Sequence, residues 1–84
     1  MKKYINVIIK DLCYLLLDLF EIQGGQKNEL EIKRIDLYIS ELEIVKKAAT
    51  QDYEDFGISS KNYRIISSMC EALRKFALAL KETY

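Results

Sequence analysis

The chain has 84 residues, and its 13 Lys and Arg balance 13 Asp and Glu, so the formal net charge is zero. Half of the residues are hydrophobic, proline is absent and there are three glycines, which favours a single globular domain of long helices (residues 1–84) over a disordered chain. Zero net charge excludes a general electrostatic attraction for nucleic acid or anionic lipid.

The first predicted helix spans residues 3–23, where apolar residues recur with the 3.6-residue period of an amphipathic helix. They are Ile5, Ile8, Leu12, Leu15, Leu16, Leu19 and Ile22. Cys13 and Phe20 widen this face to about half of the helix, so we expect it to pack against two neighbours. Gly24 and Gly25 are expected to end the helix in the left-handed conformation that glycine accepts.

The same N-terminal segment superficially resembles a signal peptide, with two lysines followed by apolar residues. Lys10, Asp11 and Asp18 interrupt the apolar run, which therefore falls short of the ~18 residues that a membrane span needs. No small-residue cleavage site follows. We therefore expect a cytoplasmic protein that does not insert into a membrane.

The second predicted helix spans residues 28–56, with an alternative end near residue 50. Asn28 is a favourable N-cap, and Glu31 completes a capping box with it. A core stripe recurs at spacings of three and four residues. It consists of Ile35, Tyr38, Leu42, Val45 and Ala49. On nearly the opposite side lie Leu30, Leu37 and Ile44, seven residues apart as in a coiled-coil seam; we call these three residues the outer stripe.

The segment QDYEDFGISS, residues 51–60, combines three carboxylates with two aromatic residues. Tyr53 and Phe56 continue the core stripe, and Gly57 is predicted to be the left-handed residue that ends the helix. The carboxylates oppose the helix dipole at this end, so fraying after Ala49 is the alternative.

The third helix is predicted over residues 59–83, with Ser59 as its N-cap. Its core stripe is Ile66, Met69, Cys70, Leu73, Phe76, Ala77 and Leu80. Three helices with short connections predict an all-α, up-down-up antiparallel three-helix bundle, with dimerisation as an alternative way to complete the core. Cys13 and Cys70 are expected to be reduced thiols packed as small hydrophobic residues.

The sequence has few residues in patterns that support catalysis or bind a metal or a phosphate group. The chain has no histidine, which excludes Ser–His and Cys–His pairs and the common zinc sites. An EF-hand is not expected either, because Phe56 and Tyr63 would occupy ligand positions five and twelve. No glycine-rich phosphate loop occurs. We therefore predict that the chain is not an enzyme and has no metal, no cofactor and no small-molecule substrate.

Charge is distributed unevenly along the second half. Residues 59–84 carry five Lys and Arg against two Glu, whereas residues 50–58 carry three acids and no base. The basic excess is interpreted as a solvated helix face, with a weak nucleic-acid strip on the third helix as the alternative.

The outer stripe is the main functional signal, because a helix with two opposite apolar stripes contacts two partners. It is either buried between the other helices or left for an external partner. We expect a protein-binding module, such as an inhibitor, an immunity-type factor or an adaptor, with a phage or mobile element among its candidate sources. The predicted partner-binding residues are Leu30, Leu37, Ile44, Asp52, Tyr53, Glu54 and Asp55. A structural homodimer is the alternative, and nucleic-acid binding comes third.

Overall fold

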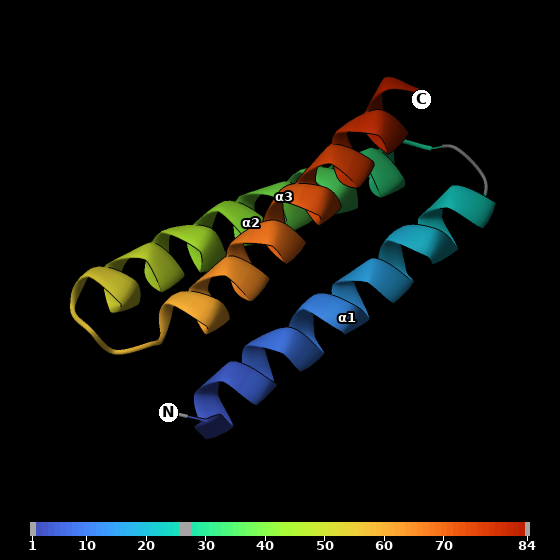
Figure 1. Cartoon of the computed structure of the whole chain (residues 1–84). Helices are drawn as coiled ribbons and strands as arrows, with labels where there is room; N and C mark the ends of the chain where they lie inside the picture. Colours follow the sequence, from blue (N-terminus) through green and yellow to red (C-terminus); the bar gives the residue numbers. More distant parts are fainter. Residues whose placement is uncertain (1, 26–27, 84) are drawn as a thin grey trace.

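The computed structural model describes residues 2–25 and 28–83, and the side chains of residues 5–25 and 28–83. Three helices are present: α1 (Lys2–Gly24), α2 (Glu29–Glu54) and α3 (Ser60–Glu82). They lie lengthwise beside one another in a shape of 43 × 18 × 16 Å (Figure 1). No residue in the described ranges belongs to a β-strand, so the predicted all-α class is confirmed.

The helices α2 and α3 form the closer pair. Lys81 Nζ lies 2.7 Å from Asp36 Oδ1 near one end, and Lys46 Nζ lies 2.9 Å from Glu71 Oε1 farther along. Because residue numbers rise along α2 as they fall along α3, the two helices run in opposite directions (Figure 1). These contacts are compatible with the predicted bundle.

The core is built from apolar residues of all three helices. The fully buried side chains include Leu19, Ile35 and Ile66, each from a different helix. Burying a side chain of this size contributes about 1.5–3 kcal/mol. The helix α1 contacts mainly α3 and approaches α2 less closely, so one side of the core is less well covered than the others.

Both predicted N-caps are confirmed. The Asn28 side-chain oxygen accepts a hydrogen bond from the Glu31 backbone N–H at 3.0 Å. The Ser59 hydroxyl accepts one from the Asn62 backbone N–H at 3.1 Å. Each bond satisfies a donor that the first turn of a helix leaves unpaired, for a stabilisation of about 1 kcal/mol.

The end of α2 differs from the prediction. The helix continues past residue 50 and ends at Glu54, after which Phe56 adopts a φ of 60°. The Phe56 N–H donates to Tyr53 O at 3.1 Å and the Gly57 N–H donates to Asp52 O at 2.6 Å. These two bonds form a Schellman motif with Phe56 in the left-handed position. The prediction that Gly57 takes this position was wrong by one residue.

The side chain of Phe56 is also not in the core. It is 95% exposed, because the left-handed backbone turns it away from the stripe that a continuing helix would follow. The first buried residue after the Schellman motif is Ile58.

The end of α1 also differs from the prediction. Gly24 and Gly25 were wrongly predicted to be left-handed, since no glycine in the described ranges has a positive φ.

Two predicted packing residues of α1 are exposed as well. Cys13 and Phe20 lie outside the buried face, because the neighbouring helices cover a narrower part of α1 than the sequence suggested. The Phe20 ring still contacts Phe76, with ring centroids 5.3 Å apart. Cys70 is buried as predicted, and neither cysteine forms a disulfide.

Candidate protein-interaction surface

The outer stripe lies on the surface of α2. Leu30, Leu37 and Ile44 are 67%, 64% and 67% exposed, respectively. The interpretation in which α2 buries both of its stripes inside the chain is therefore wrong. Both α1 and α3 contact the core side of α2 and leave the opposite side to solvent. Three large apolar side chains aligned on one helix form the kind of patch that marks an interface.

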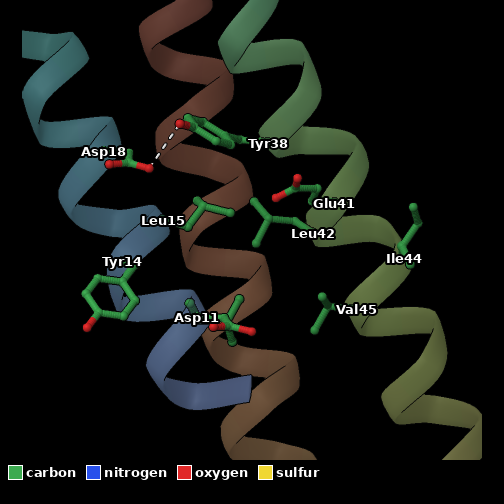
Figure 2. Close-up of a pocket in the computed structure, with 10 residues that line it drawn as sticks. Asp11, Tyr14, Leu15, Asp18, Tyr38, Glu41, Leu42, Ile44 and Val45 are labelled. Atoms are coloured by element: carbon green, nitrogen blue, oxygen red, sulfur yellow. Dashed lines mark hydrogen bonds between the residues drawn. The ribbon is translucent and has the colours of Figure 1, made fainter. Parts of the chain in front are cut away.

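An open groove lies beside this stripe, between α1 and α2 (Figure 2). It has a volume of about 330 Å³, and buried side chains such as Leu12, Leu15 and Leu42 line it. Figure 2 shows Leu15 and Leu42 pointing towards each other from the two helices. Ile44 belongs to both the groove and the outer stripe. The two features therefore form one continuous surface.

The charged residues that line this groove are all acidic. Its lining includes Asp11, Asp18 and Glu41 and no Lys or Arg; we call it the acidic groove. The Tyr38 hydroxyl donates a hydrogen bond to Asp18 Oδ2 at 3.0 Å, across the groove (Figure 2). Charged and apolar groups side by side suit a ligand that is apolar along its centre and basic at its edges.

A cation is held close to the Tyr38 hydroxyl. The Arg34 guanidinium donates to Tyr38 Oη at 3.3 Å and to Glu31 Oε1 at 3.2 Å. The hydrogen bond to Tyr38 is the main cause of a raised pKa of the Arg34 guanidinium, and Glu31 adds to it. Arg34 therefore remains charged, with its donors directed at groups of its own chain.

Both sides of the outer stripe carry charged residues. Lys33, Ser40 and Lys47 each follow a stripe residue by three positions and therefore lie on one side of it, where Asp36 lines the same hollow as Lys33. Glu41 and Arg34 follow Leu37 and Leu30 by four positions and lie on the other side, Glu41 in the acidic groove and Arg34 bonded to Tyr38. Each side of the outer stripe thus carries charges of both signs.

The predicted acidic end of α2 is a separate group. Asp52 lies eight residues after Ile44, about 12 Å along the helix. The Tyr53 ring stacks on Tyr63, with centroids 4.6 Å apart and planes 6° apart, so Tyr53 is mainly a packing residue. The structure therefore divides the predicted site into the outer stripe and this end of the helix.

The remaining acids of that end are on the surface. Glu54 and Asp55 are exposed, whereas Asp52 is half-buried. The Gln51 side-chain amide donates to Asp55 Oδ2 at 3.1 Å. Of these three acids, only Asp52 is partly shielded from solvent, and it is also the one nearest to the outer stripe in sequence.

A second, smaller groove lies between α1 and α3. It has a volume of about 190 Å³ and is almost entirely apolar, with Cys13, Leu16, Met69 and Phe76 in its lining. The neighbouring Cys70 is buried, and burial raises the pKa of its thiol. Nothing polar converges on this groove, so it lacks the features that would orient a ligand.

Two of the α3 cations face acids of α2. Lys81 pairs with Asp36, and Arg74 Nε lies 3.9 Å from Glu43 Oε1. The basic excess of α3 is therefore partly neutralised within the chain, which weakens the case for a nucleic-acid strip. Within residues 2–25 and 28–83, no cluster of acidic or cysteine side chains has the arrangement of a metal site. None of the described helices is long and apolar enough to cross a membrane.

Sequence reasoning missed the acidic groove. Asp18 was interpreted only as an interruption of the apolar run and Tyr38 as part of the core stripe, so their contact was not anticipated. The positions of Lys33 and Glu41 could have been derived from their spacing to the outer stripe. The groove itself could not, because it depends on the separation of α1 and α2.

Comparisons of the chain with models of protein families, with curated proteins and with solved structures find no match. The function is therefore inferred from the surface residues.

Proposed function

We propose that this chain is a small non-catalytic interaction module that acts by binding a larger protein, as an inhibitor, an immunity-type factor or an adaptor does. The three helices form an up-down-up bundle with one incompletely covered side. The interface consists of the outer stripe and the acidic groove, and the occupant is a helix of the partner.

The exposure of the outer stripe is the observation that carries this proposal. Leu30, Leu37 and Ile44 are each about two-thirds exposed although Leu and Ile are among the residues most often buried. Removing apolar surface from water contributes about 25 cal/mol per Å². A partner that covers all three side chains would gain this energy without any rearrangement of the bundle.

The shape of the surface favours a helix as the occupant. The acidic groove runs between two helices and has an apolar floor that includes Leu15, Leu42 and Val45. An amphipathic helix laid in such a groove buries residues at spacings of three and four. It would complete a four-helix arrangement by covering the groove between α1 and α2, the two helices that contact each other least.

The charge of the groove restricts the partner further. Asp11, Asp18 and Glu41 line the groove and no Lys or Arg does. The nearby cations Arg34 and Lys10 contact the lining tyrosines Tyr38 and Tyr14, which leaves an excess of negative charge. A helix whose apolar stripe is bordered by Lys or Arg would match this excess, and an acidic helix would be repelled. The partner helix is therefore expected to be basic along its edges.

The experiment compares the wild-type chain with two variants as baits for interacting proteins. Leu37→Asp changes the centre of the outer stripe. Leu17→Asp is the matched control, because Leu17 is similarly exposed but lines neither groove. A captured protein is identified by mass spectrometry, purified, and titrated calorimetrically with each variant.

We expect Leu37→Asp to weaken binding by at least tenfold, about 1.4 kcal/mol for a central interface residue, and Leu17→Asp to leave it unchanged. Equal binding by wild type and Leu37→Asp would contradict the proposal. Charge reversal of Asp52, Glu54 and Asp55 tests whether the acidic end of α2 contributes to the same interface.

A further inference from the structure

We infer that α1 exchanges between two copies of this chain, so that α1 of each copy packs on α2 and α3 of the other. In this dimer the connection between α1 and α2 straightens, and the two helices become one continuous helix. The exchange itself does not depend on the proposed function. Its consequence for binding rests on that function, because it concerns the same acidic groove.

The helix α1 is held by fewer polar contacts than its neighbours. Within residues 5–25 and 28–83, the ion pairs between helices all join α2 to α3, through Lys46, Arg74 and Lys81. In the same ranges one side-chain hydrogen bond joins α1 to the other two helices, from Tyr38 to Asp18. Open grooves also flank α1 on both of its sides. The helices α2 and α3 therefore form a hairpin that holds together when α1 leaves.

Apolar burial requires that a departed α1 is replaced. Leu12, Leu19 and Ile22 of α1 are buried in the core, and returning each of them to water costs about 1.5–3 kcal/mol. The face that α1 leaves on α2 and α3 is shaped for one helix, which is α1 itself. A second copy supplies an identical α1, so the same core contacts form between chains instead of within one chain.

The connection between the two helices is able to straighten. It runs from the end of α1 at Gly24 to the start of α2 at Glu29, and the chain has no proline that would interrupt a continuous helix. Neither Gly24 nor Gly25 has a positive φ, so the bend does not require a left-handed residue. The bent form is stabilised locally by the hydrogen bond from the Glu31 backbone N–H to the Asn28 side chain, at 3.0 Å.

The geometry of the dimer follows from that of the bundle. A continuous helix over residues 2–54 is about 80 Å long. In the up-down-up bundle α1 runs opposite to α2 (Figure 1), and two long antiparallel helices related by a two-fold axis through their connections keep this arrangement. Each end of the dimer is then a three-helix bundle made of α2 and α3 of one copy and α1 of the other. The dimer is about twice as long as the closed chain, whose longest dimension is 43 Å.

Exchange makes the acidic groove a composite site. Asp11 and Asp18 come from one copy, whereas Tyr38 and Glu41 come from the other. The outer stripe is not covered by α1, so Leu37 stays exposed in both copies. The dimer therefore presents two equal docking surfaces, one at each end. A partner with two target helices would bind it more tightly than the monomer, because the second contact forms within the same complex.

The first experiment measures mass and maximum dimension by analytical ultracentrifugation and small-angle X-ray scattering, with reductant present. Each sample is unfolded in urea and refolded at its final concentration, so that exchange reaches equilibrium. Wild type is expected to be a monomer at low concentration and, at millimolar concentration, a dimer about 80 Å long. A dimer that formed side by side through the outer stripe would keep the length of the closed chain.

The matched variants change the two connections of the chain. Gly25→Ala combined with Asn28→Ala is expected to raise the association constant at least tenfold, because alanine favours the continuous helix and the bent form loses its N-cap. Alanine also fits the closed chain, since a Cβ at Gly25 meets no atom closer than 3.4 Å. Ser59→Ala is the control. It removes the N-cap of α3 at a connection that exchange does not alter, so it should associate like wild type.

Exchange is detected directly by cross-linking two different chains. One carries Asp18→Cys and the other Tyr38→Cys, both in a Cys13→Ser background, and they are refolded together and treated with a short bis-maleimide. The exchanged dimer places these two positions of different chains across one groove and gives an interchain product, whereas closed monomers do not.

Three results would overturn the inference. They are a wild-type chain that stays monomeric at millimolar concentration, a dimer that is short and lacks the interchain product, and a double variant that associates no more than Ser59→Ala. A monomer that binds a partner through Leu37 would leave the proposed function intact. An elongated dimer whose Leu37→Asp variant binds every partner as well as wild type does would contradict the proposed function alone.

Discussion

Tyr38 of α2 donates a hydrogen bond to Asp18 of α1 at 3.0 Å. Among the side-chain hydrogen bonds within residues 5–25 and 28–83, no other bond joins α1 to α2. By contrast, α2 and α3 are joined by the ion pairs of Lys46 with Glu71 and of Lys81 with Asp36. The Tyr38–Asp18 bond therefore holds α1 at the acidic groove.

Replacing Tyr38 by Phe is expected to lower the free energy of unfolding by about 1 kcal/mol, the net contribution of one such hydrogen bond. The amides of α1 should exchange faster with solvent, because α1 has fewer contacts to lose than the other helices. Urea unfolding followed by circular dichroism measures the first effect, and hydrogen exchange the second. Asp18→Asn keeps an acceptor and should have a smaller effect. Unchanged stability of Tyr38→Phe would show that the bond does not hold α1 in place.

Replacing Phe56 by Gly is expected to stabilise the chain by about 0.5–1 kcal/mol. The residue has a φ of 60°, which costs an L-amino acid roughly 1–2 kcal/mol. Glycine removes this cost, but it also increases the conformational entropy of the unfolded chain, which offsets part of the stabilisation. Little packing is lost, because the ring is exposed. Phe56→Ala is the control and should leave the midpoint of urea unfolding near that of wild type. A destabilised Phe56→Gly variant would mean that the ring makes contacts in solution.

Acidic substitutions on the two faces of α2 should have opposite outcomes. Leu37→Asp is expected to keep the helical content and change the melting temperature by only a few degrees, because Leu37 is exposed. Leu42→Asp is expected to unfold the chain, because Leu42 is buried and an unpaired carboxylate in the core costs several kcal/mol. Thermal circular dichroism of both variants measures this. If Leu37→Asp also unfolded, the outer stripe would be part of the core.

The two thiols are expected to differ in reactivity. Cys13 is exposed, whereas Cys70 is buried and burial raises the pKa of its thiol. Because the thiolate is the reactive form, one equivalent of iodoacetamide should add quickly to the native chain and only at Cys13. Mass spectrometry of time points, with a urea-unfolded sample as control, measures the two rates. Equal rates in the native state would contradict the burial of Cys70.

The ion pair between Lys46 and Glu71 should make stability depend on pH in acid. The hydrogen bond from Lys46 lowers the pKa of the Glu71 carboxyl below its ordinary value of 4.5. The pair therefore stabilises the fold above that ordinary value, and this contribution is lost as the pH falls through the lowered pKa. Glu71→Gln should be less stable than wild type at pH 7, and the difference should disappear at strongly acidic pH. Urea unfolding at both pH values measures it, and a difference that persisted in acid would point to another role for the carboxylate.

Local signals in the sequence located most of the helix boundaries correctly. Asn28 and Ser59 were identified as N-caps because a capping side chain bonds a backbone group only three residues away, and such bonds depend on the chain next to them. Core residues such as Leu19 and Ile66 followed from the helical period. The end of α2 was less predictable. The left-handed conformation costs energy for residues other than glycine, so sequence preference favoured Gly57, whereas Phe56 adopts it in the structure.

The amino-acid sequence by itself determined three helices, their caps and the presence of an outer stripe on α2, because these depend on residues within a few turns of one another. Only the tertiary structure decided that Leu37 is exposed and that Asp18 and Tyr38 meet across an acidic groove. The first depends on which side of α2 the other two helices cover, and the second on how far α1 lies from α2. Both result from the packing of all three helices together. A period in the sequence shows that a stripe is apolar, but burial requires a second surface, and for the outer stripe no other part of the described chain provides one.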